Sequence, residues 1–249
     1  MRARWVVGLF VVSGCFAGGR RPALEPDTHV NHLALGLAQF RHGDFIRAQL
    51  TLRQAQFELS PTQPEMAEVR YYIAECDFQI GDLDAAGIEF SKVAEEFPAS
   101  EYAPLSMLRM GDAHLRQWRS PELDPSPGQT ALATYQELIA RYPNTSAAAR
   151  AQSHVGDLNE WFALKDYQTG VFYFRRKAYD SAILYFKDVI ANHQGTHEVV
   201  DALLKLVDSY RAIGYTDELR ETCENLRQYY AKTPGLDARC PAAAVAGAP

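Results

Sequence analysis

The best candidate for metal chemistry in this sequence is His193 with His197 and Glu198. Two histidines spaced i, i+4 on one helix could bind zinc, which would indicate a zinc-dependent hydrolase. Gly195 lies between them, however, at the junction of two predicted helices. We therefore interpret both histidines as solvated loop residues. The hydrolase is the alternative, and stoichiometric zinc in the purified protein would support it.

Apart from this group, few residues have the types and spacing that are typical of a catalytic site. The sequence has no Gly-x-Ser-x-Gly, no phosphate-binding Gly-rich loop and no His-Glu-x-x-His. His29 and His32 stand at the start of the first predicted helix, where we expect solvated side chains. The acidic pairs Glu95–Glu96 and Asp82 with Asp84 are typical of solvated faces and helix caps. We predict no enzyme activity, no bound metal and no cofactor.

Cys15 is positioned for lipid chemistry. Two arginines precede an apolar run from Trp5 to Val12, and small residues then lead to the cysteine. This order describes an export signal, and the run is shorter than the roughly 20 apolar residues of a spanning helix. The ending resembles the bacterial lipobox, whose cysteine thiol is diacylglycerylated and whose new amine is acylated after cleavage. We predict a lipoprotein signal peptide at residues 1–14; the alternative is an ordinary signal peptide with a chance cysteine.

Residues 15–29 are predicted to form the lipidated cysteine and a flexible tether. Glycines and prolines punctuate them, and no helical period is present. Two or more acyl chains anchor a protein stably to a bilayer. Phe16 occupies the position where an aspartate resembles an inner-membrane retention signal in enteric bacteria. The sequence therefore favours a lipid anchor in the outer membrane, with the folded part on the periplasmic face.

The net charge limits the ligands and partners that the chain is expected to bind. The formal net charge of −6 over 249 residues disfavours nucleic acid as a ligand and gives no general attraction to anionic lipid headgroups. No second apolar segment is long enough to span a bilayer.

Cys76 falls in an apolar helical pattern and is predicted to be a buried thiol. Cys223 and Cys240 could pair if the tail folds back.

Two stretches near the N-terminus repeat one pattern of small residues. Gly43 and Gly81 are 38 residues apart, and each is followed by an aspartate. Small residues at positions 36, 48, 74 and 86 would let antiparallel helices approach closely. Glycine would end the first helix with a left-handed cap, aspartate would cap the second, and a later proline would end it. The pattern resembles the tetratricopeptide repeat, whose period is about 34 residues.

Three further units follow with more drift. Residues 119–128 form a proline-rich insertion that must be a loop, and residues 146–176 keep helical spacing as either one long helix or two. No strand-like alternation occurs. We predict an all-α fold, a tetratricopeptide-repeat solenoid of about five helix-turn-helix units and about ten helices, over residues 30–232. Residues 233–249 are predicted to be a flexible C-terminal tail.

Function in such arrays usually lies on the concave surface, which the first helix of each unit lines. Aromatic and charged side chains there would suit an extended peptide with apolar side chains and a terminal carboxylate. The alternative is that the apolar candidates only pack between successive units. The groove candidates are Leu33, Leu37, Phe40, Arg41, Tyr71, Glu75, Phe78, Leu108, Asp112, Leu115 and Arg116.

Residues 142–146 and 164–182 carry a more specific resemblance. The chain reads Tyr-Pro-Asn-Thr-Ser at 142–146 and Leu-Lys-Asp-Tyr-Gln-Thr-Gly-Val-Phe-Tyr-Phe-Arg-Arg-Lys-Ala-Tyr-Asp-Ser-Ala at 164–182. These stretches are similar to a family pattern of Tyr-Pro-Asn-Ser, a long helix, then Tyr-x-x-(small)-x-Tyr-Tyr-x-x-Arg-x-x-(aromatic)-x-x-Ala, and residues 201–210 also fit. With the lipobox, the tether and five repeats in this order, the chain resembles the BamD family. Members of that family are lipoproteins of the outer-membrane β-barrel assembly machinery.

The resemblance implies a non-enzymatic scaffold. In that family the C-terminal repeats dock the barrel protein BamA, and the N-terminal groove is proposed to receive unfolded outer-membrane protein precursors. Tyr185 and Phe186 are therefore the docking candidates. The family often has an arginine where Tyr185 stands, so its ion pair with BamA does not carry over.

Other envelope lipoproteins with tetratricopeptide repeats remain alternatives. They include a pilotin for secretin or pilus assembly and a cell-envelope coordination factor. The insertion at residues 119–128 and the helical region at 146–176 favour the BamD family. A crosslinked pull-down from envelope membranes would distinguish these possibilities.

Overall fold

The computed structural model describes residues 31–241, which form eleven α-helices and contain no strand. All eleven belong to one unit that begins at His32. The predicted signal peptide, Cys15, the tether and His29 lie outside the described residues. The helices are α1 His32–Arg41, α2 Phe45–Glu58, α3 Glu65–Ile80, α4 Leu83–Glu96, α5 Tyr102–Gln117, α6 Ser126–Arg141, α7 Ser146–Arg175, α8 Tyr179–Asn192, α9 Glu198–Ile213, α10 Thr216–Tyr229 and α11 Leu236–Arg239.

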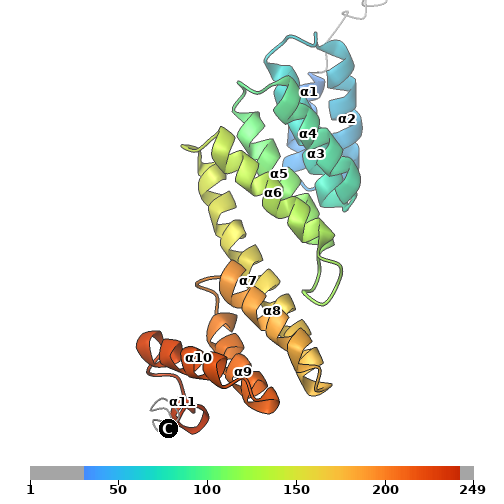
Figure 1. Cartoon of the computed structure of the whole chain (residues 1–249). Coiled ribbons are helices and arrows are strands. Elements are labelled where there is room, and N and C mark those ends of the chain that lie inside the picture. Colours follow the sequence, from blue (N-terminus) through green and yellow to red (C-terminus); the bar gives the residue numbers. More distant parts are fainter. Residues whose placement is uncertain (1–30, 242–249) are drawn as a thin grey trace, which may run out of the picture. The chain divides into compact units, whose positions relative to one another are not determined.

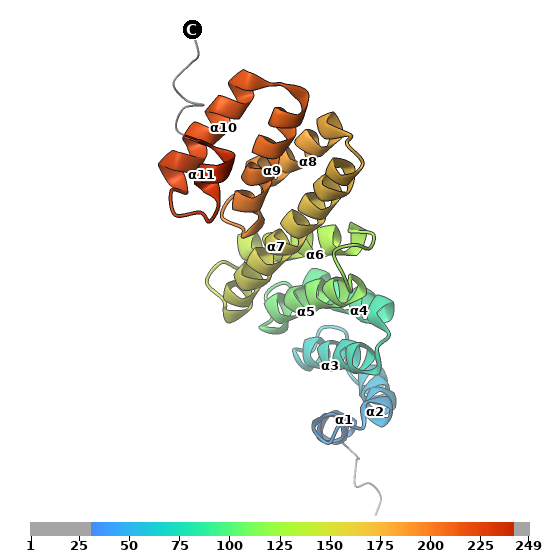
Figure 2. The ribbon, with the colours of Figure 1, turned by 90° about the horizontal axis from the view of Figure 1, so that it is seen from below.

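The first ten helices pair in sequence order into five helix-turn-helix units (Figure 1), which confirms the predicted all-α tetratricopeptide fold. Each helix from α1 to α9 packs against the next one in the chain, and α11 packs against α9. The first helices of neighbouring units also touch: α1 contacts α3, α3 contacts α5, α5 contacts α7 and α7 contacts α9. Figure 2 shows the pairs following one another in chain order. Side chains of three separate units can therefore meet on the layer of first helices.

The turns after the first helices are determined locally. Gly43 and Gly81 have φ values of 81° and 97°, in the left-handed region that a side chain disfavours. Asp44 and Asp82 then accept a hydrogen bond from the backbone N–H three residues later, which caps α2 and α4. These glycine and aspartate positions are confirmed as the sequence predicts them.

Glycines let the two helices of a pair touch. Gly36 lies against Leu52, and Gly170 lies against Phe186. A Cβ added at either glycine would come within 2.6 Å of the facing side chain, closer than real Cβ contacts. An alanine at these positions would therefore push the paired helices apart.

The structure decides whether residues 146–176 form one helix or two, and it shows where the insertion before α6 ends. Ser146–Arg175 is a single helix of 30 residues. The predicted insertion at 119–128 ends earlier, because α6 begins at Ser126. Lys165 of α7 donates hydrogen bonds to the carbonyls of Pro121 at 3.2 Å and Leu123 at 2.9 Å. These bonds hold the inserted loop against α7.

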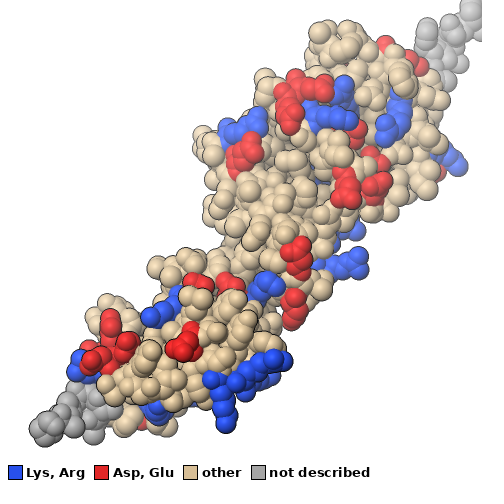
Figure 3. All heavy atoms as spheres, turned by 45° about the vertical axis from the view of Figure 1, so that its right-hand side comes forward, with Lys and Arg blue, Asp and Glu red and all other residues tan. Residues whose placement is uncertain are grey.

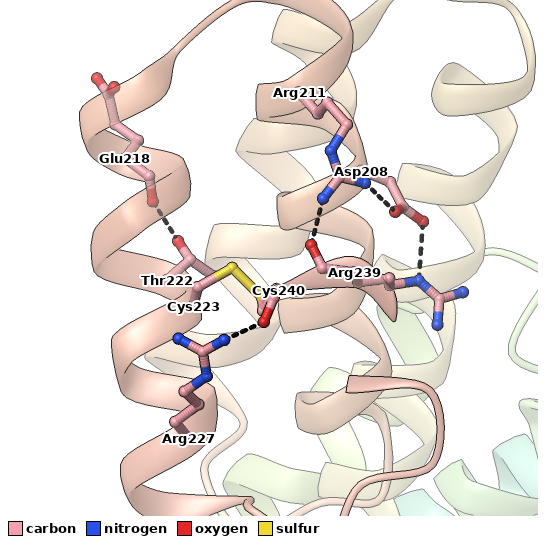
Figure 4. The surroundings of a disulfide bond; sticks show 8 residues. All are labelled: Asp208, Arg211, Glu218, Thr222, Cys223, Arg227, Arg239 and Cys240. Atoms are coloured by element: carbon pink, nitrogen blue, oxygen red, sulfur yellow. Dashed lines mark hydrogen bonds and ion pairs between the residues drawn. A yellow bond between two sulfur atoms is a disulfide. The ribbon is translucent and has the colours of Figure 1, made fainter. Parts of the chain in front are cut away.

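The C-terminal segment is folded as far as Cys240, which corrects the prediction of a flexible tail from residue 233. Cys223 of α10 forms a disulfide with Cys240, just after the short helix α11 (Figure 4). Arg227 donates a hydrogen bond to the Cys240 carbonyl, and Leu236 is buried in the same core. A helix of four residues is too short for its apolar periodicity to be recognised in the sequence. The disulfide and the buried Leu236 hold this segment against the last repeat.

The described helices bury their apolar faces in four clusters that follow the order of the units. Each cluster draws on adjacent helices, as expected for an array stabilised by its nearest neighbours. On the face shown in Figure 3, acidic and basic side chains are interspersed. Within residues 31–241, none of the helices has the length and apolar character needed to cross a membrane.

Candidate functional site

A chain of hydrogen bonds joins α3, α5 and α6. Arg109 of α5 donates two hydrogen bonds to Glu75 of α3, at 2.5 and 2.7 Å, and one to Asp112 at 3.1 Å. Tyr71 donates to Glu75 at 2.9 Å, and Tyr135 of α6 donates to Asp112 at 2.8 Å. A buried carboxylate is tolerated only when such partners compensate its desolvation. These five groups therefore hold three helices in one arrangement.

The surroundings of Arg109, Tyr71 and Tyr135 raise the pKa values of all three side chains. Burial lowers the pKa of Arg109, but its hydrogen bonds to Glu75 and Asp112 outweigh that effect and raise the pKa overall. Burial, followed by the charge of the adjacent carboxylate, raises the pKa of Tyr71 and of Tyr135. At neutral pH the arginine is therefore charged, and both tyrosines are neutral hydrogen-bond donors.

Phe78 of α3 lies between two guanidinium groups. Arg109 and Arg116 are 4.1 and 4.7 Å from the centre of its ring. Arg116 also donates a hydrogen bond of 3.1 Å to the Phe78 carbonyl. Cation–π contacts of this kind are stabilising and directional, so the ring and both arginines are held in place.

A cavity of about 640 Å³ lies beside this ring and is bounded by α3, α5 and α7. Among the predicted groove residues, Tyr71 and Glu75 belong to the hydrogen-bonded chain, and four others line the cavity. The lining from α7 and from the start of the inserted loop was not predicted from the sequence. The complete lining is Phe78, Asp112, Leu115, Arg116, Trp118, Arg150, His154, Asp157, Leu158, Glu160 and Trp161.

The cavity wall combines aromatic rings with charges of both signs. Arg116 and Arg150 supply the cations, and acidic residues of α5 and α7 supply the carboxylates. His154 of α7 stacks on Tyr135 with ring centres 5.1 Å apart and lies 3.6 Å from Asp112. The wall could hold apolar side chains of an extended peptide and bind its polar groups.

Four predicted groove residues are packing residues instead. Leu33, Leu37 and Phe40 are half-buried against the core formed by α1, α2 and α3. Leu108 is fully buried between α5 and its neighbours. Arg41 is exposed at the end of α1 and does not line the cavity. Spacing from the small residues selected α3 and α5, which border the cavity, but it also selected α1, which does not, and it did not separate the inter-helix face from the open face.

The two docking candidates differ in exposure. Phe186 is 0% exposed and packs on Gly170, so it cannot contact a partner, which corrects the prediction. Tyr185 is partly exposed and stacks on Tyr173 of α7, with ring centres 5.5 Å apart and planes 9° apart. Tyr185 alone remains a candidate for docking.

The candidate zinc histidines have other partners. The ring nitrogens of His193 lie 2.7 Å from Asn159 and 3.2 Å from Asp166 of α7, so the expectation of a solvated side chain is wrong for this residue. The α8–α9 turn packs on α7 and brings the ring there. His197 is exposed and pairs with Glu160 at 3.2 Å. Across residues 31–241, no group of three or more His, Cys, Asp or Glu side chains could hold a metal ion.

Comparison with known proteins gives one family over most of the chain. Residues 30–226 match the family described as YfiO, outer membrane lipoprotein. The outer membrane protein assembly factor BamD of Rickettsia prowazekii is 34% identical over 88 residues, 35% of this chain and 35% of that protein. BamD of Caulobacter vibrioides is 30% identical over 141 residues, 57% of this chain and 44% of that protein. The chain thus spans less than half the length of these two curated relatives.

A solved structure with a similar arrangement is the TPR2AB domain of yeast Sti1 in its pHSP90 complex. Its TM-score is 0.46 at 13% identity, over 86% of this chain and 82% of that chain.

Proposed function

The chain belongs to the YfiO family of outer membrane lipoproteins, and on that basis we propose that it is a non-enzymatic scaffold of the outer-membrane β-barrel assembly machinery. In this role it docks a BamA-like barrel protein and receives unfolded outer-membrane protein precursors. A lipid on Cys15 holds it at the periplasmic face of the outer membrane.

The cavity beside Phe78 is the observation that supports precursor binding. The rings of Phe78 and Trp161 and the guanidinium groups of Arg116 and Arg150 line it. Aromatic rings accept apolar side chains, and arginine binds carboxylates in a bidentate manner. An extended segment with apolar side chains and a free carboxylate therefore fits the chemistry of this wall.

The hydrogen-bonded chain favours the same role because it preorganises the wall. Arg109 joins Glu75 to Asp112, which lines the cavity. A site whose side chains are already fixed loses less conformational entropy when a peptide binds. The cavity thus offers an ordered surface to a disordered precursor.

Tyr185 supports a second surface on the fourth unit. Stacking on Tyr173 fixes its ring at the α7–α8 interface. Tyrosine is enriched among residues that dominate binding energy at protein interfaces. Docking of the BamA-like protein would then use a ring and a hydroxyl group in place of the ion pair that the family's arginine makes.

A site-specific crosslinking experiment in envelope membranes tests the proposal. A photocrosslinker at Trp161 should capture unfolded outer-membrane precursors, and one at Tyr185 should capture the BamA-like protein. The exposed Arg141 of α6 is the control position. Capture of secretin or pilus subunits at Trp161 would instead support the alternative envelope lipoproteins.

A further inference from the structure

The end of α7 carries basic side chains that lack acidic partners. Arg175 ends the helix, Arg176 is its C-cap, Lys177 follows, and Lys205 of α9 lines the same cavity as the two arginines. Within residues 31–241, none of the four forms an ion pair with a carboxylate. On the face shown in Figure 3, a group of basic side chains lies low on the molecule. The end of α7 is therefore positively charged, although the formal net charge of the whole chain is −6.

Aromatic rings support these cations. The Arg176 guanidinium lies 4.4 Å from the ring centre of Phe172, and the Lys205 ammonium lies 4.7 Å from that of Phe174. Phe172 is 49% exposed, so an apolar ring reaches solvent beside the charges. A cavity of about 670 Å³ opens here, and no acidic residue lines it. Its lining is Tyr167, Gln168, Val171, Phe172, Phe174, Arg175, Arg176 and Lys205.

Lys177 occupies a position where a side chain is conformationally unfavourable. Its φ is +62°, and it is the only residue other than glycine with a positive φ in the part of the chain that the structure describes. The equivalent residue, just before the N-cap of the second helix, is Gly43, Gly81 or Gly214 in three other units. Glycine adopts this conformation without strain. A lysine there adds a fourth positive charge directly after Arg176 in the chain despite the strain, and strained backbone of this kind clusters at functional sites.

We propose that this basic and aromatic end of α7 binds the phosphate-bearing headgroup of an anionic phospholipid at the membrane surface. Arginine forks bind phosphate oxygens in a bidentate manner, and clustered Lys and Arg side chains are attracted to anionic headgroups. The exposed ring of Phe172 favours a lipid over a purely acidic peptide, because Phe side chains beside basic residues on surface-bound helices insert at the boundary between headgroups and acyl chains. A family of outer membrane lipoproteins works beside such a surface. The contact would orient the solenoid on the bilayer, independently of the lipid on Cys15.

Native mass spectrometry of the membrane-extracted full chain in a neutral detergent tests this site. The chain is titrated with phosphatidylglycerol, and phosphatidylcholine of the same acyl chains is the neutral comparison. We expect saturable retention of phosphatidylglycerol and at least tenfold weaker retention of phosphatidylcholine. Lys177→Gly and Arg176→Gln should each weaken phosphatidylglycerol binding about fivefold, the effect of one basic residue at an anionic surface.

The Lys177→Gly variant separates binding from folding. Because glycine relieves the positive φ, its melting temperature should equal or exceed that of the wild type, so weaker binding cannot reflect unfolding. Lys92→Gln on α4, where the lysine is paired with Glu89, is the matched control and should bind lipid normally. Equal retention of both lipids, or unchanged binding by Lys177→Gly, would overturn the proposal. Displacement of the lipid by equimolar inorganic phosphate would indicate a free-anion site instead, and tighter binding of an acidic peptide would indicate a protein-docking surface.

Discussion

Arg109 and Glu75 form a two-point ion pair between α5 and α3, with N···O distances of 2.5 and 2.7 Å. The two residues lie 34 positions apart, close to one repeat length, so the pair joins equivalent helices of neighbouring units. Glu75 is only 5% exposed. The pair therefore fixes how the second unit meets the third, at the edge of the proposed peptide cavity.

Removal of Arg109 should destabilise the chain strongly. Arg109→Ala leaves Glu75 buried without its cation, and breaking a buried pair in this way costs about 3–5 kcal/mol. The exposed i, i+4 pair of Arg141 with Glu137 is the control, since Arg141→Ala should cost less than about 1 kcal/mol. Urea unfolding followed by circular dichroism measures both. Equal losses in the two variants would show that the inter-unit pair contributes nothing beyond a surface contact.

Two glycine substitutions should act in opposite directions. Gly81 has a φ of 97°, so Gly81→Ala should cost about 1–2 kcal/mol, the penalty for an L-residue in the left-handed region. Gly156 lies on an open face of α7, where an added Cβ meets no atom within 4 Å. Gly156→Ala should stabilise by up to about 1 kcal/mol through helix propensity. Thermal melting of both variants checks the signs, and a stabilising Gly81→Ala would contradict the turn described here.

Reduction should loosen the C-terminal repeat. The disulfide between Cys223 and Cys240 closes a loop of 17 residues, and a loop of that size is worth about 3 kcal/mol. Dithiothreitol should expose the segment after α10 to protease and lower the stability of α9–α11. The double variant Cys223→Ser, Cys240→Ser should behave like the reduced chain with or without dithiothreitol. If dithiothreitol does not change the rate at which protease cleaves the wild type, the crosslink does not stabilise this segment.

Cys76 should make stability fall at alkaline pH. Burial, followed by the charges of Asp77 and Glu75, raises the pKa of Cys76 from 9.0 to about 12. Below pH 9 the thiol is neutral in the folded and the unfolded chain. Between pH 9 and pH 12 it ionises mainly in the unfolded chain, so its contribution to stability is lost as pH rises. The difference in unfolding free energy between wild type and Cys76→Ala should therefore shrink from pH 8 to pH 10.5; parallel curves would contradict a raised pKa.

The two proposed surfaces should be separable by substitution. Tyr185→Ala should weaken binding of the BamA-like protein at least tenfold, a loss of about 1.4 kcal/mol, and leave precursor-peptide binding unchanged. Trp161→Ala should do the reverse, because it lines the cavity. Titration of each variant with both ligands provides the measurement. Equal weakening of both ligands by both variants, with the fold intact, would show that the surfaces are not independent.

Local rules in the sequence determined the helical units. The left-handed turns at Gly43 and Gly81 and the caps at Asp44 and Asp82 depend on φ preferences and on hydrogen bonds within three residues. Such features are visible in a single stretch of chain. The all-α repeat fold, the pairing of helices and the buried Cys76 followed from them.

Tertiary structure alone decided which faces of those helices are open. Leu108 has the same helical spacing as the cavity residues of α5, and Phe186 directly follows the partly exposed Tyr185, yet neighbouring helices cover both residues completely. Arg150 and Trp161 joined the cavity only because α7 is one helix that lies against α5. Lys205 lies beside the basic end of α7 although it belongs to another helix, α9. Periodicity in one helix specifies an apolar stripe, but the partner that covers it, and the charges that gather beside it, depend on how distant helices pack.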